Sequence, residues 1–189
     1  MKHTINNIIS RIYGHGRGWC FTSKHFSDLG SPEAIRLSLY RLEKRGAIRR
    51  LARGLYDYPK KHSVIGQLSP SPEKIARAIS ERDAIRIQPS GAYTANLLGL
   101  TEQVPAKSVY LTDGPSRTMK IGSQEIVFKK TTARNLATAG KFSGALFNAL
   151  KYIGREQISI QQIESLKNSL EASALTQLEK DRVYSPNWM

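Results

Sequence analysis

The segment from Pro32 to Arg45 holds the residues whose types and spacing have the clearest chemical meaning. If this segment is helical, one side of it collects residues that must face inward, namely Ile35, Ser38, Leu39 and Leu42. The opposite side then carries a mixture of charged, apolar and aromatic residues, which are Glu33, Arg36, Leu37, Tyr40, Arg41 and Lys44.

This mixture suits a helix that reads DNA. Arginine can donate two hydrogen bonds to guanine, an apolar side chain can contact the thymine methyl group, and tyrosine can reach a phosphate. A helix that only faces solvent tends to intersperse glutamate with lysine at i+4 spacing, and it does not usually expose a leucine and a tyrosine together. The segment therefore predicts a recognition helix that enters a groove of DNA, with a plain surface helix as the alternative.

A short basic hairpin is predicted directly after this helix. Residues 47–51 and 55–58 are strand-like runs, and the Ala52-Arg53-Gly54 connection supplies the glycine that a tight turn requires. Arg49, Arg50 and Arg53 then lie on or beside the hairpin tip, where they can hold flanking phosphates. Each such contact adds to a salt-dependent affinity whose slope is about −0.9 per neutralised charge.

The recognition helix has strong start and stop signals, and a shorter helix is expected before it. Ser31-Pro32-Glu33 combines a capping hydroxyl, a proline in the first turn and a carboxylate at the positive end of the helix dipole. Gly46 is the expected left-handed end. Thr22 or Ser23 can cap the preceding short helix, which is expected to reach Leu29.

The first residues predict another helix and one edge strand. The isoleucines at positions 5, 8, 9 and 12 form one apolar stripe, which ends at the glycines of residues 14–18. Residues 19–21 can form a single edge strand. Three helices followed by a basic hairpin make a winged helix-turn-helix, which we assign to residues 1–62 as a DNA-binding domain.

These elements give a set of residues expected to contact DNA. We expect four of them to contact bases, namely Arg36, Leu37, Tyr40 and Arg41. The others are expected to contact mainly phosphates and are Thr22, Ser23, Lys24, Ser31, Lys44, Arg49, Arg50 and Arg53.

The charge balance also indicates a polyanionic partner. The chain has 29 Lys+Arg against 15 Asp+Glu, so its formal net charge is +14. Residues 1–61 alone carry 13 basic residues and four acidic ones. A basic cluster of this density repels itself unless a polyanion lies close to it, and double-stranded DNA is the partner we expect.

Composition excludes several other classes of protein. The chain is 40% hydrophobic, which is enough for a buried core, and no stretch approaches the ~20 apolar residues of a membrane span. The first residues lack the pattern of a secretory signal. Cys20 is the only cysteine, so internal disulfides and four-cysteine metal sites are excluded. We expect a soluble, cytoplasmic protein that needs no cofactor or metal and does not bind a membrane.

Residues 63–189 predict a second domain with less legible chemistry. Residues 60–72 resemble a linker, and helices are expected after Pro72 and Gly91, with a strand at 85–87 between them. Strands at 108–112, 118–121 and 125–129 are joined by turns, which favours an antiparallel meander. Two apolar stripes follow, and they consist of Phe142, Leu146, Leu150 and Ile153, and of Ile163, Leu166, Leu170, Ala174 and Leu178.

The expected fold class is therefore α+β. A winged helix-turn-helix is followed by a mixed α/β domain with a small antiparallel sheet and C-terminal helices. The stripe from Ile163 to Leu178 could serve dimerisation, but we favour packing within its own domain.

Residues that could carry an enzymatic reaction form no strong pattern. Asp113 and Glu125 could serve a metal-dependent nuclease with Lys129 or Lys130, which is the main alternative to a repressor, but Val127 stands where such enzymes place lysine.

Other candidate sites are weaker. A zinc site at His15, Cys20 and His25 has unconvincing spacing, and Cys20 between two aromatic residues suits a core better than a nucleophile. The turn at Ser90-Gly91 could bind phosphate or merely cap a helix. An adaptor whose winged helix binds protein is the remaining possibility.

Several segments resemble the AbiEi-type antitoxins. The similar stretches cover most of residues 20–130 and are Ala34–Gly46, Ile48–Tyr56, Gln88–Ala92, Ala95–Thr101, Gln103–Ala106 and Tyr110–Gly114. The resemblance implies a type IV toxin–antitoxin or phage-defence operon, in which the winged helix represses its own promoter through inverted repeats. It also implies that the second domain opposes a nucleotidyltransferase-like toxin. The spacing of the residues shows no evident catalytic equipment in that domain, so we expect that the chain is not an enzyme.

Operator binding by one copy is expected to be weak. A single winged helix buries only ~600–1,000 Å² on DNA. We therefore expect a homodimer, or paired monomers, on two half-sites.

Overall fold

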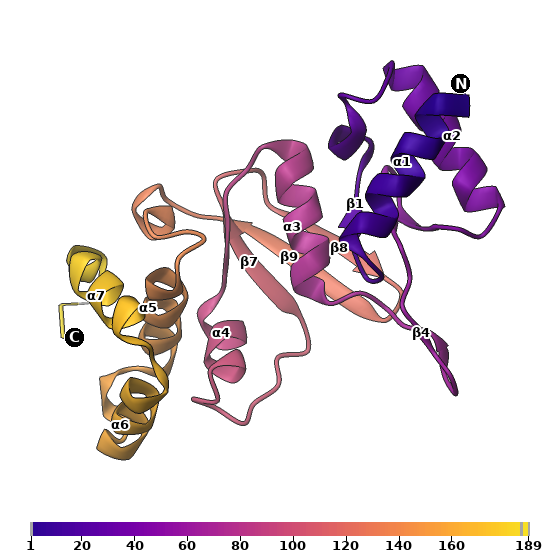
Figure 1. Ribbon diagram of the computed structural model, residues 1–189. Coiled ribbons are helices and arrows are strands. Elements are labelled where there is room, and N and C mark those ends of the chain that lie inside the picture. The colour runs from indigo at the N-terminus through magenta and orange to yellow at the C-terminus, as the bar shows by residue number, and fades with distance from the viewer. Residues whose placement is uncertain (1, 186, 189) are drawn as a thin grey trace. The chain divides into compact units, whose positions relative to one another are not determined.

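A computed structural model describes residues 2–185, 187 and 188, and it divides the chain into two units (Figure 1). The first unit runs to Ala84 and includes Ile121–Ser123, and the remaining residues form the second unit. The boundary between the two units falls after α3 (Pro72–Asp83), whereas the sequence analysis divided the chain between residues 62 and 63. The cause is a set of bonds from Lys24 and His25 to the last turn of α3.

The first unit begins with two α-helices and a short 3₁₀ turn between them. Helix α1 spans Lys2–His15, so it ends within the glycine run of residues 14–18, as the sequence predicted. The short helix expected to reach Leu29 is only the 3₁₀ element η1 (Ser23–Phe26). Its backbone bonds join residues three apart, as in His25 N–H to the Thr22 carbonyl, so an α-helix does not develop.

Helix α2 (Pro32–Lys44) has the ends that the sequence predicted. The Ser31 hydroxyl accepts a hydrogen bond from the Ala34 N–H at 3.3 Å, and Pro32 occupies the first turn. Gly46 follows the helix with φ +68°, the left-handed conformation that glycine adopts without strain.

A three-stranded antiparallel sheet completes the predicted hairpin. Strands β2 (Arg49–Ala52) and β3 (Leu55–Asp57) are joined at Gly54, whose φ is +72°. Strand β1 (Cys20–Phe21) pairs with β3, so the order is β1-β3-β2 and β1 is an edge strand as expected. The register shifts between Arg50 and Ala52 close to the tip.

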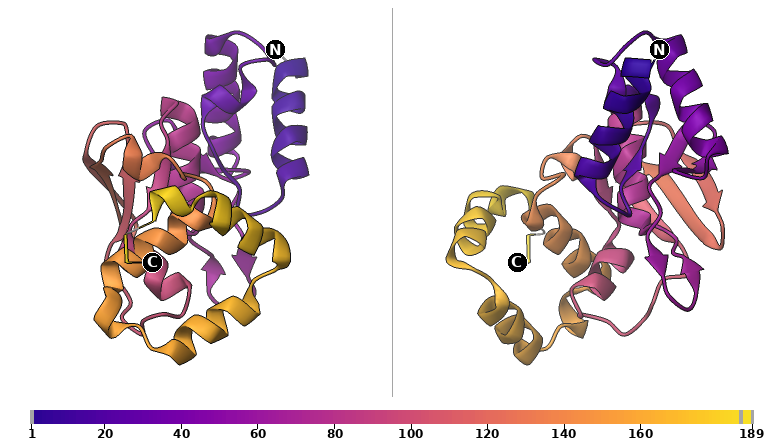
Figure 2. Two further views of the ribbon diagram at one scale, coloured as in Figure 1. Left: turned by 90° about the vertical axis from the view of Figure 1, so that its left-hand side faces the viewer. Right: turned by 45° about the vertical axis from the view of Figure 1, so that its right-hand side comes forward.

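The core of the first unit joins α1, α2 and the small sheet. Figure 2 shows α1 and α2 side by side, and they contact one another. The buried side chains come from all of these elements and are Ile8, Ile12, Phe21, Phe26, Ile35, Leu39, Leu42 and Ile48. Phe21 and Phe26 meet edge to face with ring centroids 5.5 Å apart.

A second hairpin lies where the sequence suggested a linker. Strands β4 (Lys61–His62) and β5 (Gly66–Gln67) pair in an antiparallel manner, and Gly66 has φ +76°. Figure 1 shows this hairpin extending away from α1 and α2.

The second unit contains a four-stranded mixed sheet. Its strands are β6 (Ile87–Pro89), β7 (Ser108–Thr112), β8 (Arg117–Ile121) and β9 (Gln124–Lys130), in the order β6-β7-β9-β8. Strands β6 and β7 are antiparallel, but β7 and β9 are parallel, so the predicted meander is wrong. Strand β8 lies at the edge of the sheet. After the tight turn at Gly122, β9 runs back along β8 and lies between β8 and β7.

Helices cover the rest of the second unit. They are α4 (Gly91–Leu97), α5 (Phe142–Ile153), α6 (Ile160–Ser169) and α7 (Ala172–Lys180), with the 3₁₀ elements η2 (Arg134–Leu136), η3 (Arg155–Gln157) and η4 (Arg182–Tyr184). The second apolar stripe that the sequence predicted is therefore divided between α6 and α7, because α6 ends just before Leu170. Figure 2 shows α5, α6 and α7 arranged in a ring.

Close packing and one buried carboxylate hold these helices. Gly91 lets α4 lie against the Asn148 carbonyl of α5, where a Cβ atom would collide. Leu166 and Leu178 pack on the core of their own unit, as expected of that stripe. Asp181 accepts hydrogen bonds from Lys141 Nζ at 2.9 Å and Ser143 Oγ at 2.5 Å, and the Ser143 bond holds the pKa of this carboxyl below its ordinary value.

Among the described residues, none of the helices combines the length and the apolar content that a bilayer crossing requires. The order of the helices and strands makes the observed fold mixed α and β, with N-terminal helices followed by small sheets and C-terminal helices.

One ion pair joins the hairpin of the first unit to the segment that follows it. Arg49 donates two hydrogen bonds to Asp57, at 3.0 and 2.7 Å, across the β2–β3 ladder. The same guanidinium donates to the Leu68 carbonyl at 2.8 Å. Asp57 is 1% exposed, and its carboxylate raises the pKa of Arg49 above its ordinary value. A buried carboxylate of this kind depends on its partner, because water cannot replace it.

Replacing Arg49 with alanine should therefore lower the free energy of unfolding by about 3–5 kcal/mol, since Asp57 is left buried and unpaired. The neighbouring exposed Arg50 is the matched control, and Arg50→Ala should change stability by less than about 0.5 kcal/mol. Urea denaturation followed by circular dichroism measures both. Equal losses in the two variants would show that the ion pair has no special structural role.

Candidate nucleic-acid interface

The exposed side of α2 carries the mixture of residues that the sequence predicted. Its buried residues are Ile35, Ser38, Leu39 and Leu42, and Ser38 is satisfied by donating to the Ala34 carbonyl at 2.7 Å. Leu37 is 39% exposed and Tyr40 is 53% exposed. Arg36, Arg41 and Lys44 are exposed on the same helix. The structure therefore brings together the four residues expected to contact bases.

The contacts among these side chains are weak enough to be exchanged for a ligand. Arg36 Nη2 lies 3.2 Å from Glu33 Oε1, but both side chains are at least 70% exposed. Such exposed pairs contribute about 0–1 kcal/mol. Lys44 Nζ lies 5.6 Å from the centre of the Tyr40 ring, a cation–π contact. In the part of the chain that the structure describes, the Arg41 guanidinium has no hydrogen-bond partner.

Two of the three arginines of the β2–β3 hairpin are exposed, and the third is half-buried in an ion pair. Arg53 is exposed beside Gly54 at the turn. Arg50 is exposed too, and its Nε makes only a long bond, 3.4 Å, to the Ala52 carbonyl. The Arg49 guanidinium donates to both carboxylate oxygens of Asp57. Its role is therefore structural, and the prediction that Arg49 binds phosphate is wrong.

Two more of the predicted phosphate ligands have internal partners. Thr22 is 1% exposed, and its hydroxyl lies 3.2 Å from His25 Nδ1, so a phosphate has no access to it. Lys24 Nζ donates to the Glu81 carbonyl at 3.0 Å and to the Arg82 carbonyl at 3.4 Å. It therefore caps the C-terminal end of α3, where a cation interacts favourably with the helix dipole.

The two serines of the predicted set, Ser23 and Ser31, differ in the hydrogen bonds that their hydroxyl groups can still offer to a phosphate. Ser23 is exposed, and with Arg36 it lines a surface depression of about 400 Å³ between η1 and α2. The Ser31 hydroxyl is exposed and already serves as the cap of α2, which leaves its proton for a phosphate. Both serines stay in the candidate interface.

The β4–β5 hairpin adds basic and apolar residues that the linker interpretation missed. Lys60 and Lys61 are exposed at its base, and Val64 and Ile65 at its tip are 84% and 69% exposed. The His62 ring accepts the Val64 N–H at 3.2 Å and so shapes the tip. A β-branched pair followed by glycine, after two lysines, was the available signal in the sequence.

The carboxylates proposed for a nuclease both have cationic partners. Asp113 accepts the Arg86 N–H at 2.8 Å and Arg86 Nε at 2.9 Å, and these bonds hold its pKa below the ordinary value. Glu125 Oε1 lies 2.9 Å from Lys107 Nζ. Within the described residues there is no group of three or more His, Cys, Asp or Glu side chains placed to hold a metal ion.

The residues of the other weak candidate sites make contacts that stabilise the fold. The His15 ring stacks on Trp19 with centroids 3.9 Å apart, and His25 Nε2 pairs with Glu81 Oε2 at 2.8 Å. Ser90 precedes α4 and accepts the Thr94 N–H and hydroxyl with its carbonyl, as a helix start does. Cys20 is 3% exposed, and burial, with a smaller effect from Asp57, raises its pKa to about 12.

The thiol of Cys20 should therefore be unreactive in the folded protein. A pKa of about 12, instead of the ordinary 9.0, lowers the thiolate fraction at neutral pH about a thousandfold. Titration with Ellman's reagent should release the coloured product only after urea unfolds the chain, and the unfolded sample supplies the stoichiometric control. Rapid release from the native protein would contradict the burial of this thiol.

Most of this chain matches the model of a protein family. The model of a family described as "Family of unknown function (DUF6088)" aligns with residues 7–178, which include parts of both units. A search of curated proteins found none that matches. Because the family model covers most of its length, the chain belongs to the DUF6088 family.

Proposed function

We propose that this protein is a sequence-specific repressor that binds double-stranded DNA. In this proposal the first unit is a winged helix-turn-helix, α2 is its recognition helix and the β2–β3 hairpin is its wing. One observation carries the proposal: α2 exposes Leu37 and Tyr40 among Arg36, Arg41 and Lys44, although its other side is fully buried. Exposing such residues together makes sense for a helix whose surface meets a partner.

The dimensions of α2 suit the major groove. A helix of 13 residues is about 20 Å long, and the major groove of B-DNA is about 12 Å wide and admits one α-helix. Arg36 and Arg41 can each donate to guanine O6 and N7, and Leu37 can contact a thymine methyl group. Glu33, which now accepts from Arg36, can instead accept from the amino group of cytosine.

Electrostatic attraction to the phosphates would hold the helix in register. The cations available for this purpose are exposed and lie on three elements of the first unit, and they are Lys44, Arg50, Arg53, Lys60 and Lys61. Each phosphate neutralised releases counterions and adds about 0.9 to the salt slope. These contacts position the protein but do not distinguish one sequence from another.

Two copies would be needed for tight binding. A single winged helix buries only about 600–1,000 Å² of surface on DNA, so paired half-sites are the natural target. An operator made of inverted repeats, bound by a homodimer or by paired monomers, fits this requirement.

We further propose that the repressor acts as the antitoxin of a type IV toxin–antitoxin system. The residue-level resemblance to AbiEi-type antitoxins over residues 20–130 supports this, and a nucleotidyltransferase-like toxin would be the target. Co-expression with the product of a neighbouring nucleotidyltransferase gene tests it. Restored growth supports antagonism, and growth arrest that the protein does not relieve would remove the antitoxin part and leave the repressor part standing.

The variant Arg41→Lys tests whether Arg41 contacts a base specifically or only contributes positive charge. The variant keeps the positive charge but loses the planar fork, so it should bind a duplex selected from a random pool about 1–3 kcal/mol more weakly. Its affinity for unselected DNA should stay unchanged. Electrophoretic mobility shifts on both duplexes measure this, with Arg45→Lys as the matched control, because Arg45 is exposed at the end of the same helix but outside the predicted set.

Arg53→Ala should behave in the opposite way. It removes a phosphate contact, so both duplexes should lose affinity about equally and the salt slope should flatten by about 0.9. Binding measured across a range of salt concentrations gives the slope. A loss confined to the selected duplex would assign Arg53 to base reading, and binding that ignores salt would favour a protein-binding adaptor.

The same duplexes test the nuclease alternative. Incubation with Mg²⁺ should leave the labelled DNA intact. Cleavage that Asp113→Asn abolishes would instead support a metal-dependent nuclease.

A further inference from the structure

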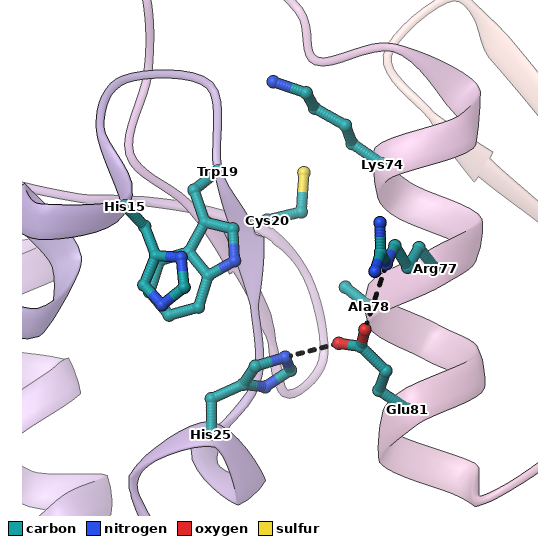
Figure 3. Close-up of a pocket in the computed structure, with 8 residues that line it drawn as sticks. All are labelled: His15, Trp19, Cys20, His25, Lys74, Arg77, Ala78 and Glu81. Carbon is teal, nitrogen blue, oxygen red and sulfur yellow. Dashed lines mark hydrogen bonds and ion pairs between the residues drawn. The ribbon is translucent and has the colours of Figure 1, made fainter.

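A pocket of about 440 Å³ lies within the first unit, between α3 and the segment that contains β1 and η1 (Figure 3). Trp19 and Cys20 form one wall, and Lys74, Arg77 and Ala78 of α3 form the opposite one. Its volume is within the range of small-molecule sites, about 300–1,000 Å³. The pocket is separate from the exposed side of α2, since none of its lining residues belongs to that helix.

Glu81, the carboxylate among the lining residues, is already paired with two other lining residues. Glu81 Oε2 lies 2.8 Å from His25 Nε2, and Glu81 Oε1 accepts from Arg77 Nε at 3.2 Å. Arg77 uses only Nε in this contact, so the two terminal NH₂ groups of its guanidinium can donate to a ligand, and its side chain is 79% exposed. Across the described residues, Lys74 Nζ has no hydrogen bond or ion pair. One turn of α3 therefore offers two cations to an incoming anion.

The wall opposite these cations is aromatic. The rings of His15 and Trp19 stack with centroids 3.9 Å apart and an interplanar angle of 13°. Figure 3 shows the indole nitrogen of Trp19 on the side that faces α3. An indole N–H is a hydrogen-bond donor only and lies in the plane of its ring, so this wall presents the edge of the aromatic stack, with one donor directed into the pocket.

The pocket is not equipped for covalent chemistry. Its Cys20 is buried, and in a buried protonated state a thiol is a small apolar group. The remaining lining groups are the two cations, the aromatic stack, Ala78 and the His25–Glu81 pair, a set suited to binding.

We propose that this pocket binds a small molecule of the mononucleotide class, in which a planar ring is joined to a phosphate. The ring would lie against the edge of the His15–Trp19 stack, where a ring acceptor atom can bond the indole N–H, and the phosphate would lie between Lys74 and Arg77. Guanidinium and ammonium groups are the usual phosphate partners, and aromatic side chains are the usual partners of bases. The assignment goes beyond the repressor proposal and does not depend on it, because none of the residues that line the pocket belongs to the predicted DNA-contacting set.

Fluorescence of Trp19 provides the test. The chain has two tryptophans, so the full-length Trp188→Phe variant leaves Trp19 as the only reporter. Titration with adenosine monophosphate should quench this emission to saturation. Adenosine and inorganic phosphate, added separately, should each bind about tenfold or more weakly, since each makes only part of the contacts.

Lys74→Gln in the same background should weaken adenosine monophosphate binding about tenfold and leave circular dichroism unchanged, because Lys74 is exposed. Lys167→Gln, an exposed lysine on α6, is the matched control and should bind as the parent does. Absence of saturable quenching by adenosine monophosphate overturns the proposal. So does quenching that Lys74→Gln leaves intact, and equal binding of phosphate alone would overturn the role of the aromatic wall.

Discussion

The burial of one side of α2 is the constraint on which the first unit depends. Ile35, Leu39 and Leu42 fill the core against α1 and η1, and the helical period then fixes which residues face outward. Leu37 and Tyr40 cannot be hidden without pulling the others out of the core. The cap at Ser31 and the left-handed Gly46 hold both ends of the helix, so its exposed side is rigidly presented.

Local signals predicted this part of the molecule well, for physical reasons. The start at Ser31, the end at Gly46 and the turn at Gly54 depend on hydrogen bonds and φ angles of residues close in sequence. The apolar stripe that includes Ile8 and Ile12 likewise follows from helical spacing alone. The same kind of reasoning correctly placed the strands 108–112, 118–121 and 125–129 to within about a residue at each end.

Non-local pairing decided what the sequence could not predict. Arg49 resembled its neighbour Arg50 until the register of β2 on β3 set it opposite Asp57. Lys24 resembled a free basic residue, but its partners are carbonyl groups near residue 81, at the far end of another helix. The parallel pairing of β7 with β9 depends on which strand takes the edge of the sheet, and turn residues do not encode that choice. The pocket beside Trp19 arises from the same long-range docking of α3.

The attachment of α3 has a consequence for dividing this chain into working parts. A fragment that ended at residue 62 would retain η1 but lose the carbonyl groups and the carboxylate that Lys24 and His25 bind. It would also uncover Cys20 and the edge of β1, a strand of two residues that contacts α3. A crossover between relatives, whether natural or engineered, should therefore disturb the first unit less when it falls after Ala84 than when it falls inside the β4–β5 hairpin.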